Sequence, residues 1–440
     1  MANFAWTSLT PPQWYGLVEL STIITWQAIR VSRWIICSLL SPLALFAVRL
    51  FTRILRRVFP TFGLDGMTFT FLLTIFVANV FCLTFRLSDR NDLASRSGIL
   101  ATVNLITLLM GTRLSDGSAF LGVSLRTYGI LHASVSGITL IESGIHTVIV
   151  LINNLEWSSL KTWGTVALAG MCSAALSPIP GFRRYFYECF LGLHTGTTGA
   201  AVAALSQHLS VQKAQARFYI FGGVALWTGL CAISFLVNCY YNINFGPGHW
   251  LPKVNIVKVY RTENYDQVVL LDACHLEVQV NRRWHARPGA YLFISIPALG
   301  LTSIFQSHPF WIIWWETDPT SGVTQLDVLV RRRRGFTRRL LSNRDEEYTA
   351  WISRPFGGGE NFGDFGSVLM FATDVGVAAH IPHLKMLMQG RTEASIRTKH
   401  VVLVWQVNDC NHDKWVKKWF DKLLPNDTSF VSSNDMTVST

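Results

Sequence analysis

Long apolar segments alternate with short polar loops up to about residue 241, and this pattern restricts the chain to few folds. A helix that crosses a membrane needs about 20 mostly apolar residues. Only 15% of the 440 residues are charged, whereas about 25% is typical of soluble proteins. A weaker segment, 13–30, contains Glu19 and is predicted to lie at the membrane surface. We predict a membrane protein with seven spans, six or eight being the alternatives, at 34–51, 68–86, 97–112, 129–152, 163–179, 187–209 and 217–241.

The net charge of +11 does not require a nucleic-acid partner, and we predict none. Much of the excess lies in loops beside apolar segments and in the run "RRRRGFTRR". If residue 241 onward is cytosolic, seven spans put the loops with Arg53 and Arg183 on the cytosolic side, which agrees with the positive-inside rule. The eight cysteines show no CxxC spacing, and the N-terminus shows no secretory signal peptide.

Beyond about residue 252 the pattern changes to short strands, such as "KVNIVKVYRT" and "YLFISIP", which favour a small antiparallel β-barrel. An α/β pattern follows, with a strand, a turn and a helix at 366–388 and a second strand at 400–409. The fold class is thus a multi-domain membrane protein with an all-α transmembrane bundle, a β-barrel and a partial α/β domain. The predicted boundaries are 1–96 for N-terminal transmembrane segments, 97–241 for the transmembrane domain, 252–350 for the barrel and 351–440 for the α/β domain.

Two apolar segments each contain a pair of histidines fourteen residues apart, in "LHASVSGITLIESGIHTV" and "LGLHTGTTGAAVAALSQHL". Fourteen residues of α-helix rise about 21 Å and rotate to about 40° short of four full turns. Each pair therefore lies on nearly one helix face, toward opposite membrane leaflets. The two helices are two spans apart and run parallel, so His132 is level with His194, and His146 with His208.

Two imidazoles at each level could hold the iron of a haem on both sides, an arrangement suited to electron transfer. Interhelical hydrogen bonding, a proton relay or a metal-ion path through the membrane are the alternatives. Nearby glycines would let a flat macrocycle approach the backbone, or would serve close helix packing instead; they are Gly137, Gly144, Gly196 and Gly199.

The second half contains three further motifs. "RPGAYLFISIP" places a Pro-Gly turn before a strand, and "FQSHPFWIIWW" places His308, Pro309 and Phe310 before a very apolar strand. "VRRRRGFTRRLL" joins a basic run to a glycine and a predicted helix start, where arginines and backbone N–H groups would suit a pyrophosphate. A solvated basic face or attraction to anionic lipid explains the arginines equally well.

Together with "RPFGG" and "FATDVGVAAHIPHLKML", these motifs resemble the ferric and cupric reductases of the yeast and fungal type, which are relatives of the NADPH oxidases. The resemblance runs from about Arg96 to about Leu424. It implies two b-type haems, FAD in the barrel and NADPH in the α/β domain. It also implies electron transfer from cytosolic NADPH to an extracellular ferric or cupric chelate, in a plasma-membrane protein that serves iron or copper uptake.

The resemblance assigns residues to each cofactor. The haem ligands would be His132, His146, His194 and His208. The FAD site would contain His308, Pro309, Phe310, Arg334, Gly335, Phe336 and Thr337. The NADPH site would contain Pro355, Phe356, Gly357, Gly376, Val377 and Ala378. Membrane lipid, the metal chelate and iron permease or oxidase components are the implied partners.

Several positions depart from the family pattern. Trp311 stands where relatives often have a threonine, Arg354 where they have a glycine, and Ala133 where they have an arginine. Thr373 and Asp374 replace a glycine-containing pair before the nucleotide turn, and a late Cys-Gly motif is not found. Two alternative functions remain: an oxidase that produces superoxide, and a haem-binding relative without NADPH-dependent turnover.

Overall fold

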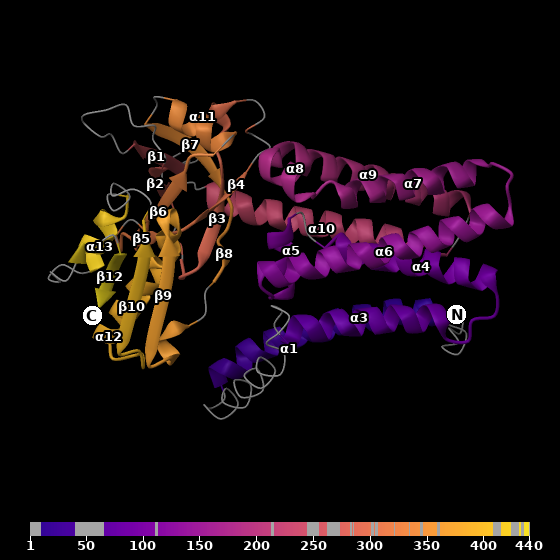
Figure 1. Cartoon of the computed structure of the whole chain (residues 1–440), viewed down its shortest axis with the longest axis horizontal. Coiled ribbons are helices and arrows are strands. Elements are labelled where there is room, and N and C mark those ends of the chain that lie inside the picture. Colours follow the sequence, from indigo (N-terminus) through magenta and orange to yellow (C-terminus); the bar gives the residue numbers. More distant parts are fainter. Residues whose placement is uncertain are drawn as a thin grey trace. The chain divides into compact units, whose positions relative to one another are not determined.

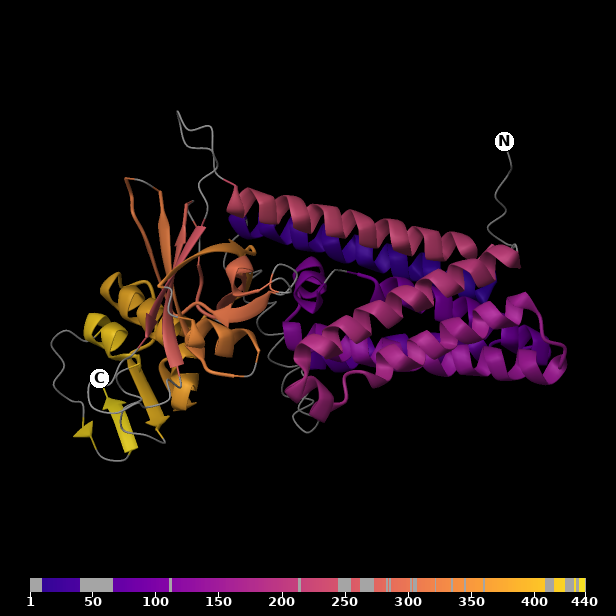
Figure 2. The ribbon, with the colours of Figure 1, turned by 90° about the horizontal axis from the view of Figure 1, so that it is seen from above.

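The structure is a computed structural model of the whole chain (Figures 1 and 2). The chain consists of two compact units, residues 1–232 and 233–440, and each is described by itself. The boundary between them lies within one long helix. The described residues are 10–39, 66–110, 113–212, 215–243, 255–261, 273–281, 284, 286–300, 303, 307–320, 322–333, 335–343, 346–358, 361–407, 415–423, 431–432 and 435–439.

The first unit is helical. Asp89, Ser124 and Ser158 each begin a helix by accepting a hydrogen bond from the backbone amide three residues on, which satisfies one of the free N–H groups of the first turn. The helices are α1 (Pro11–Leu39), α3 (Gly66–Thr84), α4 (Arg90–Leu108), α5 (Leu114–Leu121), α6 (Leu125–Asn153), α7 (Ser159–Leu176), α8 (Pro180–Tyr185), α9 (Tyr187–Val211) and α10 (Arg217–Asn242).

Two of the described helices, α6 and α10, are long and apolar enough to cross a membrane, and 68–84 in α3 is a shorter apolar stretch. The predicted segments from 68–86 onward each overlap a helix. The division between 13–30 and 34–51 is wrong, because one helix, α1, continues from Pro11 to Leu39. The remainder of 34–51 lies outside the described residues.

The bundle buries polar side chains among apolar ones and exposes large apolar side chains. Asn79, Asn104 and Glu142 are buried between helices, whereas Ile141 and Phe76 are more than half exposed. This differs from a water-soluble core and follows when the surrounding medium is hydrocarbon, because polar groups must then find partners inside the protein.

The second unit contains a curled antiparallel sheet with the strand order β4-β3-β7-β1-β2-β6-β5, and with β8 beside β3. The end strands β4 and β5 are not paired with each other in the part of the chain that the structure describes, so the predicted closed barrel is instead a half-barrel. The strands are β1 (Asn255–Arg261), β2 (Ala273–Val280), β3 (Ala290–Ser295), β4 (His308–Trp311), β5 (Trp314–Thr317), β6 (Thr324–Arg331), β7 (Glu347–Ile352) and β8 (Phe356–Gly357).

The chain crosses between the two ends of this sheet in two residues. The Ile312 N–H donates to the Ala290 carbonyl on β3, and the Ile313 N–H donates to the Asp327 carbonyl on β6. Alternate residues of the strands point inward, as β2 shows, and form a core with Leu276, Leu292 and Ile294 at its centre. Helix α11 (Phe336–Ser342) and a 3-10 turn, η3 (Pro297–Leu299), belong to this part of the unit.

The predicted strand–turn–helix–strand unit is observed. β9 (Ser367–Thr373) leads through η6 (Asp374–Ala379) into α12 (Ile381–Thr392), and β10 (His400–Gln406) returns parallel to β9. An antiparallel strand follows beside β10, so the sheet has the order β11-β12-β10-β9 in the described chain. The remaining elements are η5 (Phe362–Asp364), α13 (Lys417–Leu423), β11 (Val431–Ser432) and β12 (Asp435–Ser439).

Candidate functional site

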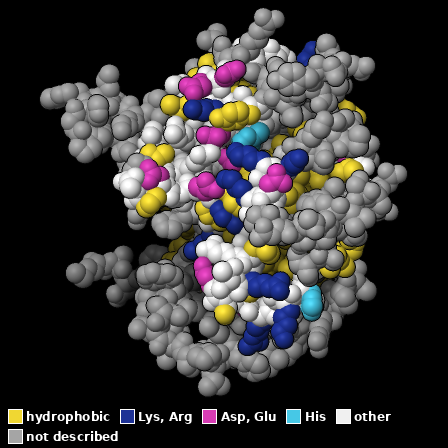
Figure 3. All heavy atoms as spheres, turned by 90° about the vertical axis from the view of Figure 1, so that its left-hand side faces the viewer, with side chains coloured by type: hydrophobic (Ala, Val, Ile, Leu, Met, Phe, Trp, Pro, Cys, Tyr) yellow, Lys and Arg dark blue, Asp and Glu magenta, His cyan; other side chains and the backbone are white. Residues whose placement is uncertain are grey.

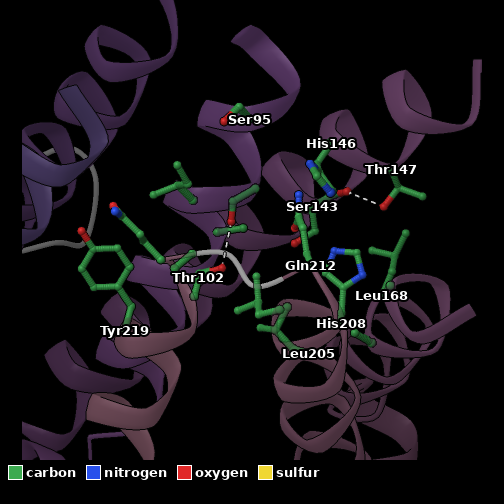
Figure 4. Close-up of a pocket in the computed structure, with 18 of the residues that line it drawn as sticks. Ser95, Thr102, Ser143, His146, Thr147, Leu168, Leu205, His208, Gln212 and Tyr219 are labelled. Atoms are coloured by element: carbon green, nitrogen blue, oxygen red, sulfur yellow. Dashed lines mark hydrogen bonds between the residues drawn. The ribbon is translucent and has the colours of Figure 1, made fainter. Parts of the chain in front are cut away.

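Helices α6 and α9 bring the four histidines together in the two predicted pairs. The ring centres of His132 and His194 are 6.3 Å apart, and those of His146 and His208 are 6.1 Å apart. Because the pairs meet in the same order along both helices, α6 and α9 run parallel at this site, as predicted. Figure 4 shows His146 and His208 beside one cavity.

A neighbouring helix holds each histidine of the second pair in the same way. The His146 Nδ1 lies 2.8 Å from the Ala94 carbonyl on α4, and the His208 Nδ1 lies 2.9 Å from the Leu160 carbonyl on α7. One turn later on each supporting helix stands a glycine. A Cβ added to Gly98 would lie 2.8 Å from the His146 ring, and one added to Gly164 would lie 3.1 Å from the His208 ring.

The first pair is supported on one side. The His194 Nδ1 lies 2.9 Å from the Ala174 carbonyl and 3.2 Å from the Ser177 hydroxyl, both at the end of α7. The His132 Nδ1 is buried and has no hydrogen-bond partner in the part of the chain that the structure describes. The hydrogen bonds therefore orient the His194 ring, whereas no contact of Nδ1 orients the His132 ring among the described residues.

These contacts set the tautomers. A carbonyl can only accept, so Nδ1 carries the proton in His146, His194 and His208, and Nε2 is left with a lone pair. This is the usual arrangement around metal-ligating histidines. A metal–imidazole bond is about 2 Å long, so two imidazoles on opposite sides of one metal ion have ring centres about 6 Å apart. Both pairs have this spacing, and their donor chemistry fits the iron of a haem.

The glycines predicted to admit a flat macrocycle have open space beside them. A Cβ added to these four glycines of α6 and α9 would meet nothing within 4 Å among the described residues, so they are not helix-packing positions in the structure; they are Gly137, Gly144, Gly196 and Gly199. Gly170 on α7, by contrast, packs against Ala201. A cavity of about 370 Å³ adjoins the second pair, and Ser143, Gln212 and Tyr219 line it (Figure 4).

The residues predicted for FAD meet on the curled sheet. The ring of His308 on β4 stacks on Phe336 at the start of α11, with centres 4.4 Å apart, and Phe310 lies 6.1 Å from the same ring. Pro309 pairs with Phe293 of β3. Phe336 is 1% exposed and belongs to the sheet's core, so it positions its neighbours rather than offering its ring to a ligand.

A tight turn at Gly335 leads into the short helix α11. Gly335 has a φ of +79°, a conformation that favours glycine. The Thr337 hydroxyl accepts the Arg333 N–H at 2.8 Å and closes the turn. Arg334, predicted for the FAD phosphates, lies outside the described residues. Trp311, the residue in the threonine position, is about half exposed and contacts Tyr291.

The residues predicted for NADPH lie on two different sheets. Phe356 and Gly357 form β8 beside β3, directly after Pro355 in the chain. The Phe356 ring stacks on Tyr291. Gly376, Val377 and Ala378 lie in η6 after β9. Val377 and Ala378 are buried in the α/β core, so their backbone rather than their side chains could contact a nucleotide.

An unpredicted cluster joins α13 to the sheet. The buried Asp327 accepts a hydrogen bond from Trp419 Nε1 at 2.9 Å, and its carboxylate lies 3.4 Å from His275 and 3.3 Å from Lys418. Burial raises the pKa of Asp327, but His275, Trp419 and Lys418 outweigh it and lower the pKa to about 2. On the surface shown in Figure 3, basic and acidic side chains lie interspersed.

Two segments of the chain match known protein families, and several known proteins have similar sequences. Residues 97–206 match the family described as ferric reductase like transmembrane component, and residues 256–390 match an FAD-binding domain. Ferric/cupric reductase transmembrane component 2 of Saccharomyces cerevisiae is 25% identical over 78% of this chain and 47% of its own. The probable cell surface ferric reductase kap2 of Aspergillus oryzae is 23% identical over 74% of this chain and 45% of its own.

The predicted family resemblance is thereby confirmed. The chain spans about half the length of the curated relatives it matches. Sequence reasoning missed the supporting carbonyls of Ala94, Leu160 and Ala174, since a backbone group carries no signal in residue type. Gly98 and Gly164 did carry a signal, because each is a glycine inside a helix, where it needs a reason.

Proposed function

We propose that this chain, a homologue of the fungal ferric and cupric reductases, carries electrons across a membrane. The donor is cytosolic NADPH and the acceptor an extracellular ferric or cupric chelate. The path runs over an FAD site on the curled sheet and over the two histidine pairs of α6 and α9. A plasma-membrane location and a role in metal uptake, beside an iron permease or oxidase, follow from the same proposal.

The observation that carries the proposal is the pair geometry. Both pairs have the spacing of two imidazoles on one metal ion, and three of the four histidines have Nδ1 directed at a carbonyl. Two b-type haems, FAD and NADPH would supply the electron-transfer chemistry when bound.

The chain's own residues bind and orient these groups. The carbonyls of Ala94, Leu160 and Ala174 hold the Nδ1 protons of three of the histidines and leave their Nε2 atoms free to bind a metal. An iron held by both histidines of a pair would be suited to electron transfer rather than to oxygen binding. His308 and Phe310 would orient the flavin, and the Gly335 turn would receive its phosphates.

A reduced-minus-oxidised absorbance spectrum of membranes that contain this chain tests the proposal. Dithionite should produce a low-spin b-type haem signal, and NADPH should produce the same signal through the flavin. His146→Ala combined with His132→Ala should abolish it. His400→Ala, which removes an exposed histidine of β10, is the matched control and should leave it unchanged. A wild-type chain without a haem signal would overturn the proposal.

A second candidate is a haem-binding relative without NADPH-dependent turnover, and two residues favour it. Asp374 places a carboxylate at the turn where a pyrophosphate would bind, with its backbone at φ +46°. The Arg354 guanidinium lies over the Phe356 ring, 4.9 Å from its centre, at a position where relatives have a glycine. A haem signal with dithionite but none with NADPH would favour this second candidate.

A further inference from the structure

A buried carboxyl group of the helical unit has no part in the function proposed above. Glu142 lies on α6 between His132 and His146, and only 1% of it is exposed. Its Oε2 accepts a hydrogen bond from the Asn104 amide at 2.9 Å. Its Oε1 is buried without a partner in the part of the chain that the structure describes. A carboxyl group in a membrane domain is costly and usually has a function.

Glu142 ends a hydrogen-bonded chain of neutral groups. The Asn104 amide also donates to Asn79 at 2.8 Å, the Asn79 amide donates to the Tyr15 hydroxyl at 3.1 Å, and that hydroxyl donates back to Asn104 at 3.1 Å. The four residues come from α1, α3, α4 and α6. None of them supplies a positive charge, so the network alone leaves a charged Glu142 uncompensated.

Tyr15 and Cys82 interact electrostatically with Glu142 but carry no positive charge, and the other charged groups on the packed helices have partners of their own. Arg96 on α4 pairs with Asp92 at 2.9 Å, and Glu19 on α1 accepts a hydrogen bond from Thr107. Cys82 on α3 contacts the Pro11 carbonyl, Asp116 of α5 lies near Tyr128 at the start of α6, and Lys161 of α7 bonds to the carbonyls of Asn154 and Glu156. The charge that varies nearest to Glu142 would therefore be that of the iron site at His146.

His146 is four residues from Glu142, which is about 6 Å along the helix. A ferric haem core has one net positive charge and a ferrous core has none. In the low dielectric of the bundle this difference acts strongly on a carboxyl group one turn away. The positive charge favours the carboxylate, and its loss favours the protonated acid.

We propose that Glu142 is a proton-accepting site coupled to the iron held by His146 and His208. When one electron enters that iron, one proton from water binds to the Glu142 carboxylate, so the net charge inside the bundle is unchanged. Asn104 stabilises the carboxylate through Oε2, and Oε1 is the free oxygen that takes the proton. This proposal rests on the proposed function, since it needs a haem at the second pair.

Redox titration of the full chain, followed by haem absorbance between roughly pH 5 and pH 9, tests the coupling. In the wild type the midpoint potential of the second haem should fall with pH, because each tenfold drop in proton activity lowers it by up to about 59 mV. Glu142→Gln should abolish this slope. Glu156→Gln, which neutralises an exposed carboxylate of the α6–α7 loop, should keep it.

A second variant and a second readout complete the test. Asn104→Ala removes the amide that donates to Oε2, disfavours the carboxylate and should therefore move the sloping region to higher pH. This variant tests the proposal even if Glu142→Gln does not fold. The infrared difference spectrum should gain a protonated-carboxyl C=O band on reduction, absent in Glu142→Gln. Haem with a pH-independent potential would overturn this proposal alone, whereas absence of haem would overturn the proposed function and this proposal with it.

Discussion

The two units of the molecule differ in how much polar side chain they bury: polar groups stand among the buried apolar ones in the helical unit, whereas the core of the curled sheet is apolar. The helical unit buries Asn79, Asn104 and Glu142 and exposes residues such as Ile141. The second unit buries Leu276, Leu292 and Ile294, all at 0% exposure, around its curled sheet. Hydrocarbon outside the helices gives no reward for burying leucine, whereas water outside the sheet does.

The difference shows where each unit gets its specificity. In the sheet, packed apolar volume determines the fold. In the bundle, a few hydrogen bonds and glycines determine the positions of the His146 and His208 rings. Other glycines of the same helices have open space beside them. Variants that remove apolar volume, a charged partner or the space beside a ring test this contrast.

The largest expected effect comes from volume in the sheet. Ile294→Ala should lower the free energy of unfolding of the second unit by about 2–5 kcal/mol, because it leaves a cavity in a closed core. The matched change Ile141→Ala, on the exposed side of α6, should cost about 0.5 kcal/mol or less. Denaturant titrations of the detergent-solubilised chain, followed by tryptophan fluorescence, measure both. Equal losses would contradict the contrast between the units.

Acid should weaken the second unit through Asp327. Its folded pKa of about 2 lies below the ordinary value, so its contribution is fully present above about pH 4 and is lost as pH falls through 2. The contribution is about 2 kcal/mol. Unfolding titrations give the free energy of unfolding of wild type and of Asp327→Asn. The difference between the two proteins should be about 2 kcal/mol larger at pH 6 than at pH 2. A difference independent of pH would show that the ion pairs carry no such energy.

Gly98 is expected to affect haem binding because it leaves room for the His146 ring at the Ala94 carbonyl. Gly98→Ala puts a Cβ 2.8 Å from the imidazole, displaces it from the Ala94 carbonyl and should weaken haem binding at the second pair by about 10–100-fold. Gly222→Ala, on the exposed face of α10, meets no described neighbour within 4 Å and is the control. Haem titration of the apoprotein separates them, and equal affinities would show that Gly98 does not set the ring position.

The smallest effect is expected at the nucleotide turn. Asp374 has a φ of +46°, which glycine adopts without strain, so Asp374→Gly should change stability by less than about 1 kcal/mol. It should also tighten NADPH binding, because a carboxylate beside the phosphates is removed. A binding titration measures this, and unchanged affinity would show that the carboxylate points away from the nucleotide.

Particular residues show how far the sequence could be interpreted. The fourteen-residue spacing was sufficient to pair His132 with His194 and His146 with His208, because helix geometry is local. The strand–turn–helix pattern after Ser367 was readable for the same reason. The continuous α1 was missed, since a short polar stretch near Arg30 resembles a loop. The crossing at Ile312 and Ile313 had no signal, because it depends on strands far apart in the chain.

The sequence by itself determined which faces of α6 and α9 carry imidazoles, where the strands alternate and which motifs accompany them, since these depend on backbone periodicity. The tertiary structure alone decided which carbonyls orient His146, His194 and His208, which glycines leave open space and which amide meets Glu142. Those hydrogen bonds join residues 20 to 52 positions apart. Only packing of whole helices against one another brings such groups within hydrogen-bonding distance.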